Sequence, residues 1–515
     1  MNKMTSKIVE NTFFNFVAKT VELILTLLLS IIIARHLGPN RFGSYALVMF
    51  TFTLAGLLTN LGLSNVGVKY ISEFTGDENS EIRTKIIFYV LKIKIISTLI
   101  VSGILIILSK YFAIFYSDPQ LKMYIILFAV ALLPSGISAV CSGVIMGMQK
   151  YKYLAYKIIL ILPVHVIFSF VVLMMGYGII GLVIINVIIS FIEVLYYLIL
   201  FKTKMRFKLS FPLSLSQSIK KKIFRYNWQV ALIIFIDAIL WQRSEIFFLS
   251  RFHVNSEVAY YSLGYGIVEK VMIFLPSIFA GVLLPVISEL YGKKAHSSLQ
   301  KLYVNSTRYL ILFSAPICIG MMAISKSLIF LLYGGDYLPV ASVLNILLIS
   351  GCAGIIASAG ASIQYGTEKQ NSILKWGSVI ALGNITLDFI LIPRFGAIGA
   401  AIANATAQIG AVVIGTKIVC RLLSVRFPFK DLSKILIAAL TIVPIICVIM
   451  KLTSGLIGIV LSVIVTCFVY FVMILFLKIL NTADKEILNS ITNNLPKSTH
   501  NLYRKILNFI ERWIK

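Results

Sequence analysis

A small set of ionisable residues interrupts the long apolar runs of this 515-residue sequence. Placing a charged side chain in hydrocarbon costs about 2.5–3.5 kcal/mol on insertion scales, so such residues usually face a partner or a cavity. The basic members could hold an anion, and the acidic members could carry a proton or a small cation. The basic residues are Lys19, Lys92, Lys94, Arg243 and Lys270, and the acidic residues are Glu22, Glu193, Asp237, Glu245, Glu269 and Asp388.

Spacing places some of these residues on shared helix faces. Asp237 and Glu245 are two helical turns apart and lie on one stripe, whereas Arg243 lies about 120° from Glu245 around the helix. Lys19 and Glu22 share a face, so we expect them to neutralise each other in part. Two interpretations stay open: buried ion pairs that fix helix packing, or a cation-lined cavity for an anionic cargo.

Four carboxylates are candidates for ion coupling, that is, for binding a proton or a sodium ion. They are Asp237, Glu245, Asp388 and Glu22. Asn384 lies one helical turn before Asp388 and could add its amide oxygen as a ligand for a small cation.

The sequence contains no nucleotide-binding, catalytic or metal-binding motif. GxxxxGK[ST], HExxH and GxSxG are missing, the five histidines are scattered, and the six cysteines form no CxxC pair. The segment "GYGIIG" at 176–181 fits GxGxxG, but it joins two apolar runs without a preceding strand, so we interpret it as a tight turn. We therefore expect no enzyme activity, no metal, no disulfide and no cofactor beyond a coupling H⁺ or Na⁺.

The composition shows which elements must position these residues. The chain is 59% hydrophobic and 13% charged, with a mean hydropathy of +0.94, whereas about a quarter of the residues in soluble domains are charged. Its apolar runs lack the alternation of a β-barrel. The sequence therefore predicts an all-α polytopic membrane protein. The net charge of +27 is typical of cytoplasmic loops rich in Lys and Arg, not of nucleic-acid binding.

About 20 apolar residues per crossing predict about fourteen transmembrane helices. We place them near 10–34, 41–65, 82–109, 120–147, 152–175, 178–201, 223–250, 257–290, 303–333, 338–365, 370–392, 396–420, 431–451 and 455–479. A basic segment at 212–227 is expected along the membrane surface. The end of the chain has helically spaced apolar residues opposite Lys and Arg, which predicts an interfacial helix. If both termini are cytoplasmic, most of the Lys and Arg residues in loops and tails fall on the cytoplasmic side, as the positive-inside rule requires. We therefore expect this topology, in the cell (inner or plasma) membrane.

The sequence contains an internal repeat. "ARHLGPNRFGSYALV" at 34–48 aligns with "SRFHVNSEVAYYSLG" at 250–264, so that Arg35 matches Arg251 and Tyr45 matches Tyr261. Further on, "YGIIGLVIIN" aligns with "FGAIGAAIAN", and Asn186 matches Asn404. We therefore expect two six-helix lobes at 1–208 and 223–425, joined by a basic amphipathic linker at 209–222. Two extra helices at 426–481 and a basic amphipathic cytoplasmic tail at 482–515 complete the chain. Parallel repeats of this kind are typical of alternating-access transporters.

The polar segment after the first apolar run raises two further expectations. Arg35 and Arg251 lie at the outer end of equivalent helices and could form an outer gate, or they could extend to lipid headgroups. The Gly38-Pro39 pair and Gly43 predict a sharp turn and a close approach of the first two helices.

The segment "ARHLGPNRFGSYALV" also resembles the motif that follows the first span in Wzx-type polysaccharide biosynthesis proteins. These oligosaccharide flippases form the PST family of the MOP superfamily, which also holds the MATE exporters and the lipid II flippase MurJ. "EVAYYSLGYGIVEKVMIFLPSIFAGVLLPVISEL" is similar to its second-half counterpart. The resemblance extends over essentially the whole chain and implies a MATE-like fold.

The resemblance implies a flippase that moves lipid-linked oligosaccharide, on a polyprenyl phosphate or pyrophosphate, from the cytoplasmic to the outer leaflet. The basic residues within the spans would then contact the phosphate. Membrane lipids and polysaccharide-assembly enzymes would be its partners. Two alternatives stay open: a MATE-type cation-coupled exporter of drugs or metabolites, and a scaffold subunit of a polysaccharide-assembly complex.

Overall fold

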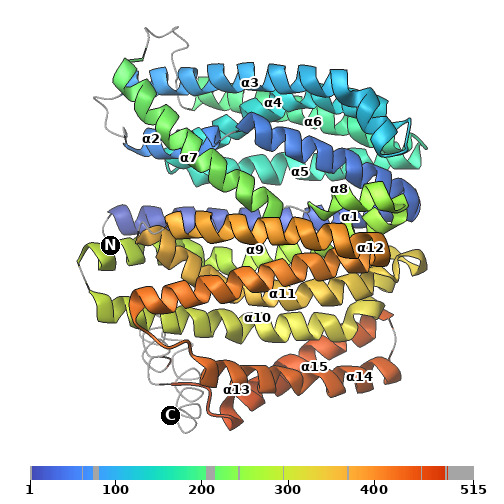
Figure 1. Ribbon diagram of the computed structural model, residues 1–515, viewed down its shortest axis with the longest axis vertical. Helices are drawn as coiled ribbons and strands as arrows, with labels where there is room; N and C mark the ends of the chain where they lie inside the picture. Colours follow the sequence, from blue (N-terminus) through green and yellow to red (C-terminus); the bar gives the residue numbers. More distant parts are fainter. Residues whose placement is uncertain are drawn as a thin grey trace. The chain divides into compact units, whose positions relative to one another are not determined.

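A computed structural model describes residues 3–60, 62–73, 80–204, 215–241, 244–293, 295–367, 370–453, 455–481 and 484. Every regular element in these residues is a helix (Figure 1). The expectation of an all-α protein is therefore confirmed. The basic tail at 482–515 lies outside the described residues except for Asp484.

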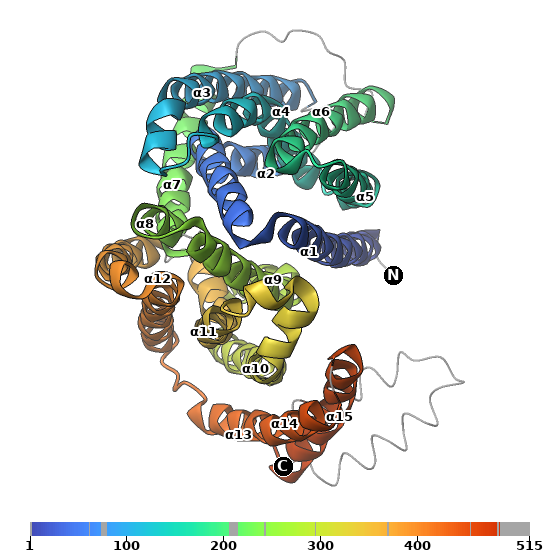
Figure 2. The same ribbon diagram turned by 90° about the vertical axis from the view of Figure 1, so that its right-hand side faces the viewer.

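The chain divides into two compact units, of which unit 1 contains Met1–Lys270 and Leu374–Ala407. Its helices include α1 (Lys3–Asn60), α2 (Leu63–Glu73), α3 (Ser80–Phe115), α4 (Leu121–Gly147), α5 (Tyr151–Met174) and α6 (Gly178–Thr203). They continue with α7 (Gln217–Trp241), α8 (Glu245–Phe252), the first part of α9 (Asn255–Gly292) and the central part of α12 (Gln370–Leu423). Among the first six helices, α4 lies between α3 and α6 and contacts both (Figure 2).

Unit 2 contains Val271–Ile373 and Gln408–Lys515. Besides the ends of α9 and α12, it holds α10 (His296–Tyr333), a short 3₁₀ turn η2 (Gly335–Tyr337) and α11 (Val340–Gly366). The added helices are α13 (Phe429–Leu440), α14 (Ile442–Leu452) and α15 (Gly455–Phe476). All three contact α10 through an apolar cluster that includes Ile311, Ile442 and Ile474.

Helix lengths agree with the expected number of crossings. Ten helices in the described part of the chain are long and apolar enough to span a membrane. Two of them, Phe14–Asn60 and Lys375–Leu423, have 47 and 49 residues, about twice the length that one crossing needs. Each is kinked at a glycine with positive φ, at Gly38 (71°) and Gly396 (57°), so each supplies two crossings. The ten helices thus supply twelve crossings. The pair α7–α8 and the long helix α9 add one crossing each, which agrees with the expected fourteen.

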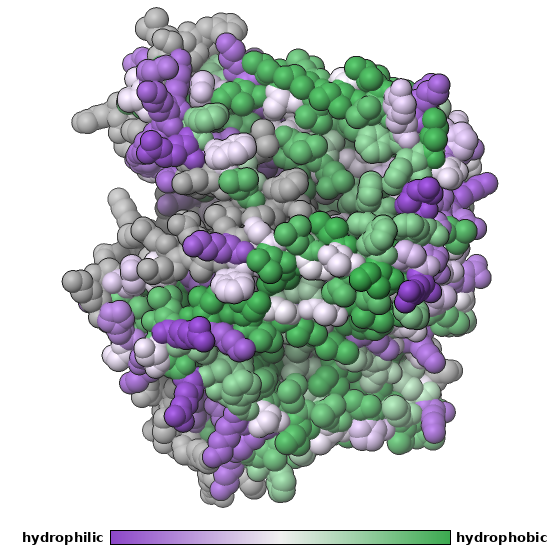
Figure 3. Space-filling model, viewed as in Figure 1, coloured by the Kyte–Doolittle hydropathy of each residue, from purple (hydrophilic) through white to green (hydrophobic). Residues whose placement is uncertain are grey.

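The distribution of hydrophobic and hydrophilic side chains also fits helices that cross a membrane. Hydrophobic residues cover the middle of the helices on the face shown in Figure 3, and hydrophilic residues gather toward the helix ends. Large apolar side chains such as Ile107, Leu160 and Leu452 are exposed. Lipid tails are the medium in which such exposure is favourable, so this chain is a multi-pass membrane protein.

Three boundaries differ from the sequence expectation. The helix expected at 223–250 is two helices, since α7 ends at Trp241 and α8 begins at Glu245. The helix expected at 431–451 is also divided, because Pro444 lacks the N–H that would bond to Leu440. The helix expected at 41–65 ends at Asn60, and α2 begins after Gly62 (φ 79°).

The linker is held by protein contacts rather than by the membrane surface alone. Leu215 and Ile223 are buried in a cluster with Tyr70 of α2 and Ile86 of α3. The Tyr70 hydroxyl also donates a hydrogen bond to the Lys222 carbonyl at 3.2 Å. In the part of this basic segment that the structure describes, from 215 onward, the buried apolar residues thus pack against α2 and α3.

Candidate functional site

The carboxylate of Glu245 is the centre of a buried polar cluster in unit 1. Glu245 is the first residue of α8 and is fully enclosed, with 0% exposure. Its Oε2 accepts a hydrogen bond from the Tyr261 hydroxyl of α9 at 2.8 Å. Its Oε1 accepts two more, from Nδ2 of Asn404 at 2.8 Å and from Nδ2 of Asn384 at 3.1 Å. Three donors from two other helices therefore converge on one acid.

Asp388 lies beside this cluster in a very different environment. It follows Asn384 by one turn of α12 and is also 0% exposed. Neither of its carboxylate oxygens has a hydrogen-bond partner among the described residues, and the same holds for Oδ1 of Asn384. Asp388 lies close enough to Glu245 for the two carboxylates to repel each other when both are charged.

These two environments assign different chemistry to the two acids. Three hydrogen-bond donors offset part of the cost of burying a charge on Glu245. A charged Asp388 would be buried with no compensating group, which is strongly unfavourable. A proton or a small cation on Asp388 would remove that cost. Among the described residues, no group of three or more His, Cys, Asp or Glu side chains could hold a metal ion.

The kink in α12 brings the two asparagines of this cluster together. Asn384 precedes Gly396 and Asn404 follows it, so a straight helix would carry them apart. Glu257 of α9 fixes the kink, because its Oε2 accepts the Ala397 N–H at 2.7 Å. A Cβ on Gly396 would lie 2.5 Å from that same oxygen.

The equivalent position in the first half has the same hydrogen-bonding residues without the acid. Tyr45, the match of Tyr261, forms a side-chain hydrogen bond with Asn186, the match of Asn404. In the register that aligns the two segments, Leu29 stands where the second half has Glu245. The acidic cluster therefore occurs in the second half and not at the matching position of the first.

The structure places the basic candidates in separate surroundings. Lys19 and Glu22 form the expected ion pair at 2.8 Å, with about two fifths of each side chain exposed. Lys92 is exposed on α3, and Nζ of Lys270 donates to the Gly266 carbonyl at 3.2 Å. Arg243 lies outside the described residues.

The remaining candidates are less informative. Of Asp237, only the backbone in α7 is described. Arg35 precedes the kink of α1, Arg251 lies near the end of α8, and both are exposed.

We had expected Lys94 to line a cavity for an anionic cargo. In the structure it is instead buried inside the first half of the chain. It is 2% exposed, and its Nζ donates to Oγ1 of Thr59 at 2.8 Å. Gly136 of α4 leaves room for it, since a Cβ there would lie 2.7 Å from Lys94 Cε. No carboxylate among the described residues pairs with its amine within 4 Å. The apolar run of α3 gives no sign of which face is enclosed, so the sequence could not place this residue.

Two functional features escaped the sequence interpretation. In the sequence, Tyr261 and Asn404 stood out as repeat matches but not as partners of an acid, yet both donate hydrogen bonds to Glu245. In the first half, Glu193 pairs with Lys157 at 3.0 Å and accepts a hydrogen bond from Ser138. The sequence did contain an indication of the role of Tyr261 and Asn404, because both have the same residue type at the matching positions of the first half, Tyr45 and Asn186.

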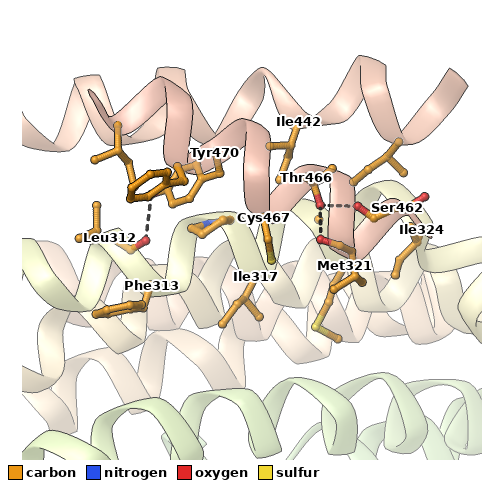
Figure 4. Close-up of a pocket in the computed structure, with 16 residues that line it drawn as sticks. Leu312, Phe313, Ile317, Met321, Ile324, Ile442, Ser462, Thr466, Cys467 and Tyr470 are labelled. Atoms are coloured by element: carbon orange, nitrogen blue, oxygen red, sulfur yellow. Dashed lines mark hydrogen bonds between the residues drawn. The ribbon is translucent and has the colours of Figure 1, made fainter. Parts of the chain in front are cut away.

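A separate cavity of about 520 Å³ lies in unit 2 between α10, α14 and α15 (Figure 4). Phe313, Met321, Ile446 and Cys467 are among its lining residues. The Tyr470 hydroxyl at its wall already donates to the Leu312 carbonyl at 2.9 Å. The lining suits hydrocarbon and offers no charged group to a phosphate.

A family model described as polysaccharide biosynthesis protein matches residues 32–342, more than half of the chain. The chain belongs to this family. The match includes the segment at 34–48 and the whole Glu245–Tyr261 region, and it confirms the resemblance seen in the sequence.

Relatives within reach of sequence comparison are distant and aligned over part of their length. The teichuronic acid biosynthesis protein TuaB of Bacillus subtilis (strain 168) is 24% identical over 138 residues, which cover 27% of this chain and 28% of TuaB. The probable low-salt glycan biosynthesis flippase Agl15 of Haloferax volcanii is 22% identical over 230 residues, covering 42% of this chain and 48% of Agl15. The chain thus spans less than half of either relative.

Solved structures extend the likeness over nearly the whole fold. The lipid II flippase MurJ in an inward closed conformation matches with a TM-score of 0.70 and 17% identity, covering 90% of this chain and 98% of that one. A multidrug resistance MATE transporter in an inward-facing conformation matches with a TM-score of 0.66 and 14% identity, covering 79% and 94%. The expected MATE-like fold is confirmed.

Proposed function

We propose that this protein is a flippase that moves a lipid-linked oligosaccharide from the cytoplasmic to the outer leaflet by alternating access. Family membership and the similarity to a glycan biosynthesis flippase support this cargo. The lipid carries a polyprenyl phosphate or pyrophosphate, and both termini of the protein lie in the cytoplasm. The protein performs no covalent chemistry on its cargo.

One observation supports ion coupling: Asp388 is buried without a hydrogen-bond partner among the described residues, next to Glu245 with its three donors. An ion gradient can drive a conformational cycle only if the two conformations bind the ion with different affinity. A carboxylate that is unfavourable when bare and enclosed provides that difference. We therefore propose that Asp388 takes up H⁺ or Na⁺ while enclosed and releases it when the site opens to water.

The same cluster argues against the alternative of a cation-coupled drug exporter. An organic cation would need an acid that it can reach, and both acids are 0% exposed. Their enclosure suits H⁺ or a small inorganic cation rather than an organic one. The MATE-like fold by itself does not decide between the two cargoes, since one fold hosts many functions.

The decisive experiment replaces Asp388 with Asn in cells of the natural host. Asn keeps the shape of the side chain and mimics a permanently neutral acid. We expect normal protein levels in the membrane, loss of surface glycan, and accumulation of lipid-linked intermediates in the inner leaflet. Asn60→Ala is a matched control, because Asn60 lies on α1 and hydrogen-bonds locally to Ser64.

Two results would count against the proposal. Unchanged surface glycan in the Asp388→Asn variant would remove ion coupling through this residue. Unchanged glycan and intermediates in a complete deletion would remove the cargo assignment, and would favour the exporter. A deletion that disperses the assembly enzymes, while Asp388→Asn has no effect, would favour the scaffold.

A further inference from the structure

Gly43 of α1 is in direct backbone contact with Asn255 at the start of α9. A Cβ placed on Gly43 would lie 1.8 Å from the carbonyl oxygen of Asn255 and 2.9 Å from its Cβ. No side chain fits at those distances, so only glycine permits the contact. We had expected Gly43 to serve the approach of the first two helices, but it serves a contact with the second half of the chain.

Hydrogen bonds reinforce this contact. Nδ2 of Asn255 donates to Oγ of Ser44 at 2.9 Å, and the Ser44 hydroxyl donates to Oδ2 of Asp118 at 2.8 Å. Ser44 is 7% exposed. One continuous chain of polar groups therefore connects the start of α9, the second segment of α1 and the turn between α3 and α4.

An aromatic pair joins the two halves as well. Phe115, the last residue of α3, stacks on Phe247 of α8 with ring centroids 4.9 Å apart and an interplanar angle of 22°. All of these residues belong to unit 1. Residues before 120 thus meet residues after 246 through a backbone contact, a polar chain and a ring stack.

These contacts share one end of the helices. α1 reaches Gly43 after a single crossing from the N-terminus, and α3 reaches Phe115 after the third. α9 begins at Asn255 directly after the crossing formed by α7 and α8. An odd number of crossings precedes each contact, so all lie on the side opposite the N-terminus, which is the outer side when the termini are cytoplasmic.

We propose that Gly43, Ser44 and Asn255 form the closed outer gate of the transport pathway. This inference rests on the proposed flippase function, because a cargo can leave on the outer side only after these residues separate. The glycine lets the two segments pack closely, and the hydrogen bonds that join Asn255, Ser44 and Asp118 must break when the gate opens. Arg35 and Arg251, which we had expected at this gate, are both exposed.

A cysteine pair tests the contact directly. Ser44→Cys and Asn255→Cys are combined in the full-length chain after its six native cysteines are replaced, with a protease site inserted between residues 204 and 215. Oxidation in isolated membranes should link the two halves, so that they stay together on a denaturing gel after cleavage and separate on reduction. The linked protein should no longer move lipid-linked oligosaccharide, and reduction should restore transport.

Adding one methyl group tests whether glycine is required. Gly43→Ala in the same background should slow the crosslinking about tenfold, because overpacking a close contact is strongly unfavourable. Gly56→Ala on the same helix is the matched control, since nothing lies within 4 Å of a Cβ there. Should Gly43→Ala fail to reach the membrane, Asp118→Ala is tested with a Phe115→Cys/Phe247→Cys pair instead, which leaves Ser44 and Asn255 in place. Loss of the acceptor for the Ser44 hydroxyl should slow that crosslinking about threefold.

Equal crosslinking rates in Gly43→Ala, Gly56→Ala and the parent would overturn the proposal. Full transport activity of the crosslinked protein would do the same. Crosslinking needs no cargo, so it reports on the gate even if the Asp388→Asn experiment removes the proposed function.

Discussion

The Tyr261 hydroxyl donates a hydrogen bond to the Glu245 carboxylate at 2.8 Å. Its repeat counterpart, Tyr45, forms a side-chain hydrogen bond with the amide of Asn186 instead of with an acid. Two copies of one segment thus use the same tyrosine differently. A hydrogen bond to a charged group is worth about 1.5–3 kcal/mol, and one between neutral groups about 0.5–1.5 kcal/mol. The second half should therefore depend more strongly on its tyrosine than the first.

Tyr261→Phe is expected to lower the thermal unfolding midpoint of the purified protein more than Tyr45→Phe. Both changes remove one hydroxyl from a buried ring, so the loss of apolar packing is matched. Fluorescence-detected unfolding in detergent measures both midpoints. Equal shifts would mean that Glu245 is neutral in the folded protein and that the two tyrosines are equivalent.

Lys94→Met is expected to leave transport intact and to keep or raise the unfolding midpoint. Met fills a similar volume, and it removes a buried amine whose described partner is the Thr59 hydroxyl. Lys94→Glu should instead prevent stable insertion, because it buries a carboxylate beside a Thr59 hydroxyl that already donates to the Gly56 carbonyl. Surface glycan in a deletion strain measures transport. Loss of glycan in a well-inserted Lys94→Met variant would return Lys94 to the cargo pathway.

Asp484→Ala should destabilise unit 2 by about 3–5 kcal/mol, because it leaves the guanidinium of Arg308 buried and unpaired. Asp484 accepts hydrogen bonds from Arg308 and from the Tyr309 hydroxyl, and both members of the ion pair are almost fully buried. Limited proteolysis after α15 measures the loosening. Glu73→Ala, which removes the exposed partner of Lys222, should change little. If the double variant Arg308→Met/Asp484→Ala is no more stable than Asp484→Ala, the unpaired charge is not the cause.

Gly399→Ala should reduce folded protein in the membrane, whereas Gly410→Ala on the same helix should not. A Cβ on Gly399 would lie 2.4 Å from the Leu391 carbonyl oxygen, and nothing lies within 4 Å of one on Gly410. Replacing an unconstrained helical glycine with alanine stabilises a helix by about 1 kcal/mol. Size-exclusion profiles of fluorescent fusions compare the two. Equal profiles would show that the turn can relax around the added methyl group.

The sequence predicted the helices and the repeat because both depend on local patterns. Apolar runs of the right length mark the crossings, and conserved spacing between Arg35 and Tyr45 marks their second copy. The acids Glu245 and Asp388 were recognisable, since a charge within an apolar run is unusual wherever it points. Their donors were not, because Asn404 lies 159 residues from Glu245 in the chain.

The sequence also could not predict which side chains are buried or which segments lie in close contact. A helix that is apolar all round gives no indication of which face is covered by protein and which by lipid. Lys94 was therefore placed in a cavity, although it lies against Thr59 and Gly136. Gly43 was recognised as a site of close approach, but its partner could not be named without the fold.

The order in which the chain is made gives the α12 kink a further consequence. A ribosome that has delivered the first six helices has already supplied both Tyr45 and Asn186, so that half can complete its hydrogen bond early in membrane insertion. Glu245 must wait for Asn384 and Asn404, and Asp388 arrives between them. During this interval Glu245 lacks two of its three donors, and protonation is the simplest way for it to remain in the membrane. Chains arrested before Asn404 should therefore be the ones that membrane quality-control proteases remove.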